Sequence, residues 1–214
     1  MAFYINSLNF PNLTAKGTPV GADLVLIADS AAGNILKQAT ITNVLAVGGG
    51  ASALTFIATA TATNSASVNF DNKITSTYDN YLLVWENFLA ATASTSLLLQ
   101  VGTGATPTYQ TTTYTTAISP SINATTAGIA LGAAANGNTA NRVGAGNAYF
   151  TNANNASNDK VAVGHSGFWN ASATDAIFSF SGRWPNATVI TSLRLIMGAG
   201  NITSGTFKLY GLSN

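Results

Sequence analysis

The chain has no cysteine, a single histidine (His165) and a single glutamate (Glu86) among its 214 residues. The absence of cysteine excludes disulfides, thiolate metal sites and cysteine nucleophiles. Enzymes depend on side chains that transfer protons or attack a substrate, and this chain has few of them. We therefore predict that the protein is not an enzyme and uses neither a cofactor nor a metal ion.

His165 lies in the stretch Gly164-His165-Ser166-Gly167, which partly matches the turn around a nucleophilic serine. That turn requires a glycine two positions after the serine, and Phe168 occupies that position. A catalytic triad would have to depend on His165 alone. The favoured interpretation is a histidine in a strand or loop that bonds to the backbone.

Four aspartates, Asp71, Asp79, Asp159 and Asp175, lie near the ends of predicted strands. Glycoside cleavage uses two carboxyl groups at a fixed separation. Folding could bring distant aspartates together, so a capsule-degrading enzyme is kept as an unfavoured alternative. The same residues could bind calcium, although the chain has no loop pattern of a calcium site. The favoured interpretation is that they cap turns.

Charge is also scarce, since only 7% of the residues are charged and a typical soluble domain has about 25%. Residues 87–141 contain no charged side chain at all. The net charge of +1 gives no electrostatic footprint for nucleic acid. The apolar runs are far shorter than the roughly 18 residues of a membrane-spanning helix. We expect neither nucleic-acid binding nor membrane insertion.

A surface of threonine, serine, asparagine, glycine and alanine favours assembly. Surfaces that pack against other subunits avoid charge, because burying an unpaired charge is costly. Uncharged edge strands would invite aggregation in a monomer, and a symmetric oligomer can cover them. We therefore predict self-association. The alternative is a secreted β-protein coated in threonine and asparagine.

Residues 1–47 form a distinct section at the start of the chain. Within it, the apolar segments 23–29 and 35–41 predict a small hairpin, and Thr42 predicts the cap of one helical turn. Residues 48–53 include three consecutive glycines, which indicate a linker because glycine has the freest backbone. We place a domain boundary there.

Residues 54–214 show almost no helical periodicity. Segments rich in β-branched and aromatic residues recur between turn residues instead. The predicted strands are residues 54–62, 67–70, 81–90, 96–102, 109–118, 128–133, 143–152, 160–170, 176–184, 190–198 and 206–212. This pattern predicts an all-β fold, a jelly-roll-like β-sandwich of about 8–11 strands.

Alternating side chains indicate which face of each strand is buried. Phe178 and Phe180 fall on one face of their strand, and Ser179 and Ser181 fall on the other. Residues 81–85 are apolar on both faces. Such a strand is either central in the sandwich or covered by a neighbouring subunit.

Surface recognition is the chemistry that remains. Aromatic rings beside amide and hydroxyl groups suit sugars, because the ring packs on C–H faces while the polar groups bind hydroxyls. The candidate receptor-binding residues are Tyr149, His165, Phe168, Trp169 and Asn170. The alternative for each aromatic residue is a place in the core or at a subunit interface.

Three segments resemble a known family. Residues 74–87 contain a Tyr-Asp-Asn-Tyr turn, an apolar strand and Glu-Asn, and residues 200–212 end in Leu-Tyr-Gly-Leu. Both resemble segments of tail fibre and related virion proteins of tailed bacteriophages. Residues 22–31 are similar to a segment that precedes the distal domains of such fibres. Residues 103–158 match no pattern of that family.

The resemblance implies a homotrimeric, β-rich component of the virion. It implies that residues 1–47 attach to other virion proteins or oligomerise, and that residues 54–214 contact the host surface, often polysaccharide or lipopolysaccharide. A short tail fibre or spike component is the expected role. A head fibre, a capsid decoration protein or an adaptor that only cements the particle remains an alternative.

Overall fold

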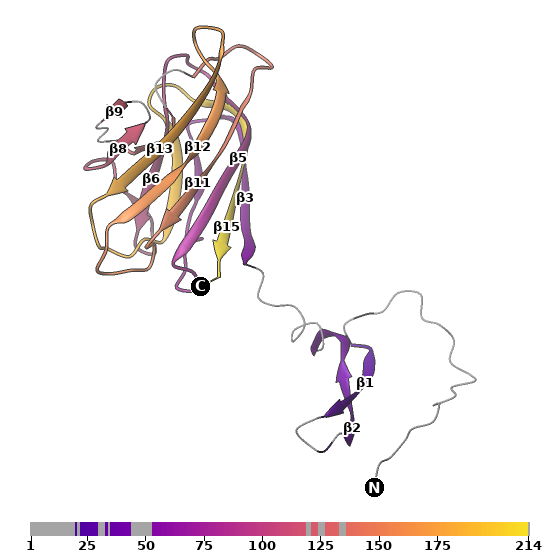
Figure 1. The fold of residues 1–214 in the computed structure, drawn as a ribbon. Coiled ribbons are helices and arrows are strands. Elements are labelled where there is room, and N and C mark those ends of the chain that lie inside the picture. The colour runs from indigo at the N-terminus through magenta and orange to yellow at the C-terminus, as the bar shows by residue number, and fades with distance from the viewer. Residues whose placement is uncertain are drawn as a thin grey trace. The chain divides into compact units, whose positions relative to one another are not determined.

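The computed structural model describes residues 20, 22–29, 33, 35–43, 53–118, 121–123, 127–132 and 136–213. The chain divides into two compact units, Met1–Ser52 and Ala53–Asn214, and Figure 1 shows the strands of both. The division falls within residues 48–53, which the sequence assigns to a linker. The three glycines of that linker lie outside the described residues.

The first unit contains an antiparallel hairpin of β1 (Leu24–Asp29) and β2 (Ile35–Thr40), which confirms the hairpin prediction. A short helical turn follows at residues 41–43. The Asn43 amide donates to the Thr40 hydroxyl at 3.1 Å, so Thr40 caps this turn. The sequence pointed to Thr42 instead. The cap comes earlier because β2 ends at Thr40, where the backbone becomes free to turn.

The second unit is a sandwich of two antiparallel sheets, which confirms the all-β sandwich prediction. The large sheet has the strand order β3-β15-β5-β11-β12-β13-β8-β9, and the small sheet has the order β10-β6-β14-β4, with β7 beside β6. The strands are β3 (Leu54–Ser65), β4 (Ser67–Phe70), β5 (Asn80–Ala90), β6 (Leu97–Thr103), β7 (Thr108–Tyr109), β8 (Thr115–Ile118), β9 (Ser121–Asn123), β10 (Ile129–Ala130), β11 (Gly144–Thr151), β12 (Lys160–Trp169), β13 (Asp175–Trp184), β14 (Ser192–Met197) and β15 (Ile202–Leu212).

The described part of this unit has more strands than the sequence indicated. The predicted strand 109–118 is two strands, because β7 pairs with β6 of the small sheet and β8 pairs with β13 of the large sheet. The chain therefore crosses from one sheet to the other within this segment. Strand β9 was not predicted, since Ser-Ile-Asn is too short and polar to show alternation.

The core lies between the two sheets and is filled by alternate residues of their strands. Tyr81, Leu83 and Trp85 of β5 point inward and are at most 2% exposed. The expected faces of β13 are confirmed, because Phe180 is buried and Ser179 is exposed. Apolar burial of this kind supplies the main stabilisation of the sandwich.

Phe207 of β15 tests the contribution of this core, because its side chain is completely buried. We expect Phe207→Ala to lower the free energy of unfolding by about 3–5 kcal/mol, the range for large-to-small core changes. Urea unfolding followed by fluorescence measures it. Ser181→Ala, at an exposed position of β13, is the control and should change stability by less than about 0.5 kcal/mol.

Tyr114 lies just before β8, where the chain changes sheets, and its ring is buried. Its hydroxyl accepts a hydrogen bond from the Val101 amide at 2.8 Å and donates to the Gln110 carbonyl at 3.2 Å. Burial raises the pKa of Tyr114 from 10.0 to about 12. The folded protein therefore favours the neutral phenol.

This shift predicts an alkaline loss of stability. The unfolded tyrosine releases its proton at lower pH than the folded one, so the stabilisation present below pH 10 is lost as the pH rises toward 12. Between about pH 9 and about pH 11, the unmodified chain should lose about 1 kcal/mol more than Tyr114→Phe. Denaturant titrations at both pH values measure the difference. An equal loss in Tyr114→Phe and in the unmodified chain would contradict the prediction.

Candidate functional site

The large sheet has an outer face, formed by the side chains that point away from the core. Strand register places five of these side chains in one row: Phe56, Tyr210, Leu82, Tyr149 and Val163. The Phe56 and Tyr210 rings meet edge to face, with centroids 5.7 Å apart. Phe56 is 56% exposed and Val163 is 40% exposed. An apolar row therefore crosses five strands of the outer face.

A second row beside the first is more polar. Asn147 of β11 lies opposite Val84 of β5 and His165 of β12, and Val84 lies opposite Lys208 of β15. The Lys208 ammonium donates to Glu86 Oε1 at 2.7 Å. Glu86 raises the pKa of Lys208 through this hydrogen bond and through its charge. The two charges therefore neutralise each other within the face.

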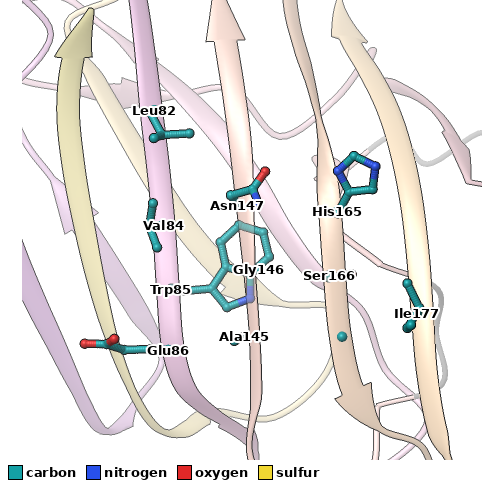
Figure 2. A pocket seen from close by; sticks show the side chains of 11 residues that line it. Leu82, Val84, Trp85, Glu86, Ala145, Gly146, Asn147, His165, Ser166 and Ile177 are labelled. Carbon is teal, nitrogen blue, oxygen red and sulfur yellow. The ribbon is translucent and has the colours of Figure 1, made fainter. Parts of the chain in front are cut away.

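A shallow depression of about 810 Å³ lies in the middle of the outer face, and Figure 2 shows the residues around it. Most of them project outward from β5, β11, β12 and β13. Trp85 and Ser166 belong to the inner side of the sheet, yet they also line the depression. The lining residues are Leu82, Val84, Trp85, Glu86, Ala145, Gly146, Asn147, His165, Ser166, Gly167 and Ile177.

The depression coincides with two local features of the backbone. Strand β11 changes register against β5 between Gly144 and Gly146, a bulge that bends the strand and disrupts the ladder. At Gly146 the Trp85 indole packs directly against the backbone, because a Cβ there would lie only 2.2 Å from the ring. The missing side chain lets the tryptophan lie below β11, as Figure 2 shows.

Ile177 stands at the edge of this depression and is 84% exposed. Its neighbour across the strands is Gly167 of β12, which has no side chain to cover it. The sequence did not single out Ile177. The alternation of the strand could have identified it. Ile177 precedes Phe178, so it falls on the outward face of the strand with Ser179 and Ser181.

The structure brings two of the predicted binding residues together on the outer face. Tyr149 belongs to the apolar row and is half-buried, while His165 lines the depression and is exposed. Trp169 lies on the same side of β12, at the end of the strand. The Arg142 guanidinium lies over its ring, 4.4 Å from the centroid. Trp169 is therefore on the same side as Tyr149 and His165 but beyond the depression.

The remaining two predicted residues have structural roles. Phe168 is buried and stacks on Phe178 with ring centroids 5.1 Å apart, so its side chain is not available to a receptor. Asn170 organises the turn between β12 and β13. Its Oδ1 accepts hydrogen bonds from the Ser172 and Thr174 amides at 2.9 and 3.0 Å. Its Nδ2 donates to the Thr174 hydroxyl at 2.8 Å.

The histidine and its neighbouring serine do not form a catalytic pair. They are consecutive residues of β12, so they point to opposite faces of the sheet. His165 is exposed, whereas the Ser166 hydroxyl is buried and has no hydrogen-bond partner in the described structure. Among the described residues that line the depression, Glu86 is the one acid, and it pairs with Lys208.

Two of the four aspartates considered for catalysis have other partners. Asp159 forms an ion pair with Arg183 at 3.0 Å, and the Tyr109 hydroxyl donates to the Asp71 carboxylate. Among the described residues, no three histidine, aspartate or glutamate side chains are grouped so that they could hold a metal ion.

Comparisons with protein-family models, with curated proteins and with solved structures found no match to this chain. Within the part of the chain that the structure describes, no helix has the length and apolarity needed to cross a bilayer.

Alanine substitutions at Gly146 and Gly167, which both line the depression, test how closely the backbone is packed there. Gly146→Ala should lower the free energy of unfolding by about 1–3 kcal/mol, because the new Cβ would clash with Trp85 and with the His165 carbonyl. Gly167→Ala should leave stability unchanged or slightly raised, because its Cβ would meet nothing closer than 3.9 Å. Urea unfolding measures both. Equal effects of the two changes would contradict this packing.

Proposed function

We propose that the chain is a structural component of a tailed-bacteriophage virion, namely a short trimeric tail fibre or spike component that binds the host cell surface. The resemblance of residues 74–87 and 200–212 to tail fibre proteins supports the virion role, and the observation that supports assembly into a trimer is the outer face of the large sheet. It presents aromatic and aliphatic side chains such as Phe56, Val163 and Ile177 to the exterior. Exposed apolar patches of this kind mark interaction surfaces.

The site chemistry favours binding over catalysis. His165 and Ser166 point to opposite sides of β12, and Glu86 is paired with Lys208. The depression is open and mostly apolar, and its polar side chains that face outward are Glu86, Asn147 and His165. The proposal therefore assigns the protein an assembly and attachment role without a reaction.

A second candidate role is a head fibre, decoration or adaptor protein that cements the particle without binding a receptor. The exposed aliphatic residues Val163 and Ile177 favour it, because aliphatic side chains suit contacts between proteins better than contacts with sugars, which need convergent hydrogen-bonding groups.

The proposed trimer is tested by light scattering on the purified full chain. The expected mass is three times the 21.8 kDa of one chain. A stable monomer at micromolar concentration would contradict the trimeric fibre. A dimer would contradict it as well, since fibre subunits are proposed to associate in threes.

The position on the particle separates the two roles. Immunogold labelling of intact particles should place the protein at the tail or its fibres, whereas label on the capsid faces would support the decoration role.

Incubation with host polysaccharide should release no reducing sugar, and release by the chain would support the capsule-degrading alternative. Binding of the labelled protein to host cells should be saturable if it recognises a receptor.

A further inference from the structure

The outer face of the large sheet carries an apolar row of side chains beside a more polar row. Single exposed apolar residues are normal on soluble proteins, but here the register makes them neighbours across the strands. The neighbouring side chains are the exposed Phe56 and Val163 and the half-buried Tyr210, Leu82 and Tyr149. Val84 follows Leu82 on the same face of β5, and the exposed Ile177 lies on β13 beyond the polar row. Contiguous apolar surface of this kind indicates contact with another molecule.

The position of strand β5 in the sheet also indicates that the outer face is covered by another molecule. It is central, with β15 on one side and β11 on the other. Strands that are apolar on both faces are typical of sheets covered on both sides. The small sheet covers Tyr81, Leu83 and Trp85. Leu82 and Val84 point the opposite way, and none of the strands of Ala53–Asn214 packs over them.

The charges of this face identify the kind of partner. Glu86 pairs with Lys208 within the face, and Arg183 pairs with Asp159 at one end of it. At the other end, Arg142 lies over Trp169. A strongly acidic or basic partner would find little complementary charge here. Asp175 lies opposite Trp169 in the strand register, so this end also carries one charge of each sign and the charges named here balance. Equivalent residues of two identical chains come close together near a symmetry axis, where an excess of one charge would repel, and a face with balanced charge limits that cost.

We infer that a second copy of this chain covers the outer face of the large sheet, with the Ile177 side chain of one copy close to the depression of another. Ile177 projects beside a hollow of about 810 Å³ floored by Trp85. Each chain therefore offers both a protruding apolar residue and an apolar recess. The inference rests on the proposed self-association and specifies which surface makes it.

The absence of cysteine makes the inference directly testable, because one introduced thiol is a unique probe. Ile177→Cys places a thiol on the outer face. Ala171→Cys is the matched control, in the exposed turn between β12 and β13. The rate of maleimide labelling is measured by mass spectrometry on the full chain, both concentrated and diluted, while light scattering records the mass of the assembly.

In the concentrated sample we expect position 177 to react at least about tenfold more slowly than position 171, which corresponds to about 1.4 kcal/mol of protection. Dilution to the monomer should remove the difference. Equal labelling in a sample that light scattering shows to be assembled overturns the inference but leaves self-association intact. A monomer that labels equally at both positions overturns both proposals. Protection that persists in the monomer also overturns the inference, because the cover would then belong to the same chain.

A charge introduced on the same face tests the inference independently, through its effect on the mass of the assembly. Val163 is exposed enough to accept a new side chain without disturbing the core. Val163→Asp should shift the assembly to the monomer with unchanged far-ultraviolet circular dichroism, because the carboxylate would be buried between copies without a partner. Ala171→Asp should leave the assembly unchanged. An intact assembly in Val163→Asp would also overturn the inference.

Discussion

Strand β5 imposes the constraint on which the rest of the structure depends, because it is apolar on both faces and central in its sheet. Its inward residues Tyr81, Leu83 and Trp85 fill the core against the small sheet. Its outward residues Leu82 and Val84 then necessarily lie on the other side, since successive side chains of a strand alternate. The same strand that stabilises the sandwich therefore creates an apolar outer surface.

Asparagine takes over several tasks that charged residues and glycine perform in other proteins. Asn64, Asn72, Asn87, Asn141 and Asn152 have φ values between 54° and 65°, a left-handed conformation that asparagine tolerates better than most residues. Positions of this kind occur where strands turn or bulge. The asparagine-rich composition is therefore partly a consequence of the many strand connections.

Side-chain amides also hold loops in place. Asn154 Nδ2 donates to the carbonyls of Thr75 and Tyr78, and Asn155 Oδ1 accepts from the backbone at the turn that follows. Lys160 is buried and donates to the carbonyls of Asn155 and Asn158 at 2.6 and 2.8 Å. Burial lowers the pKa of Lys160, although the neighbouring Asp159 opposes the shift. This buried cation stabilises a loop and serves no reaction in our interpretation.

The alternation of side chains along the sequence was enough to predict most strands of this protein and some of their buried faces. The hairpin of the first unit, most strands of the second and the inward face of β13 follow from alternating side chains, because burial on one face of a strand repeats every second residue. Only the tertiary structure decided that residues 109–118 divide between two sheets, that Phe168 is buried while His165 is exposed, and that Ile177 stands beside a depression floored by Trp85. These features depend on which strands become neighbours and where β11 bulges. Such pairings join residues far apart in the chain, and local periodicity contains no information about them.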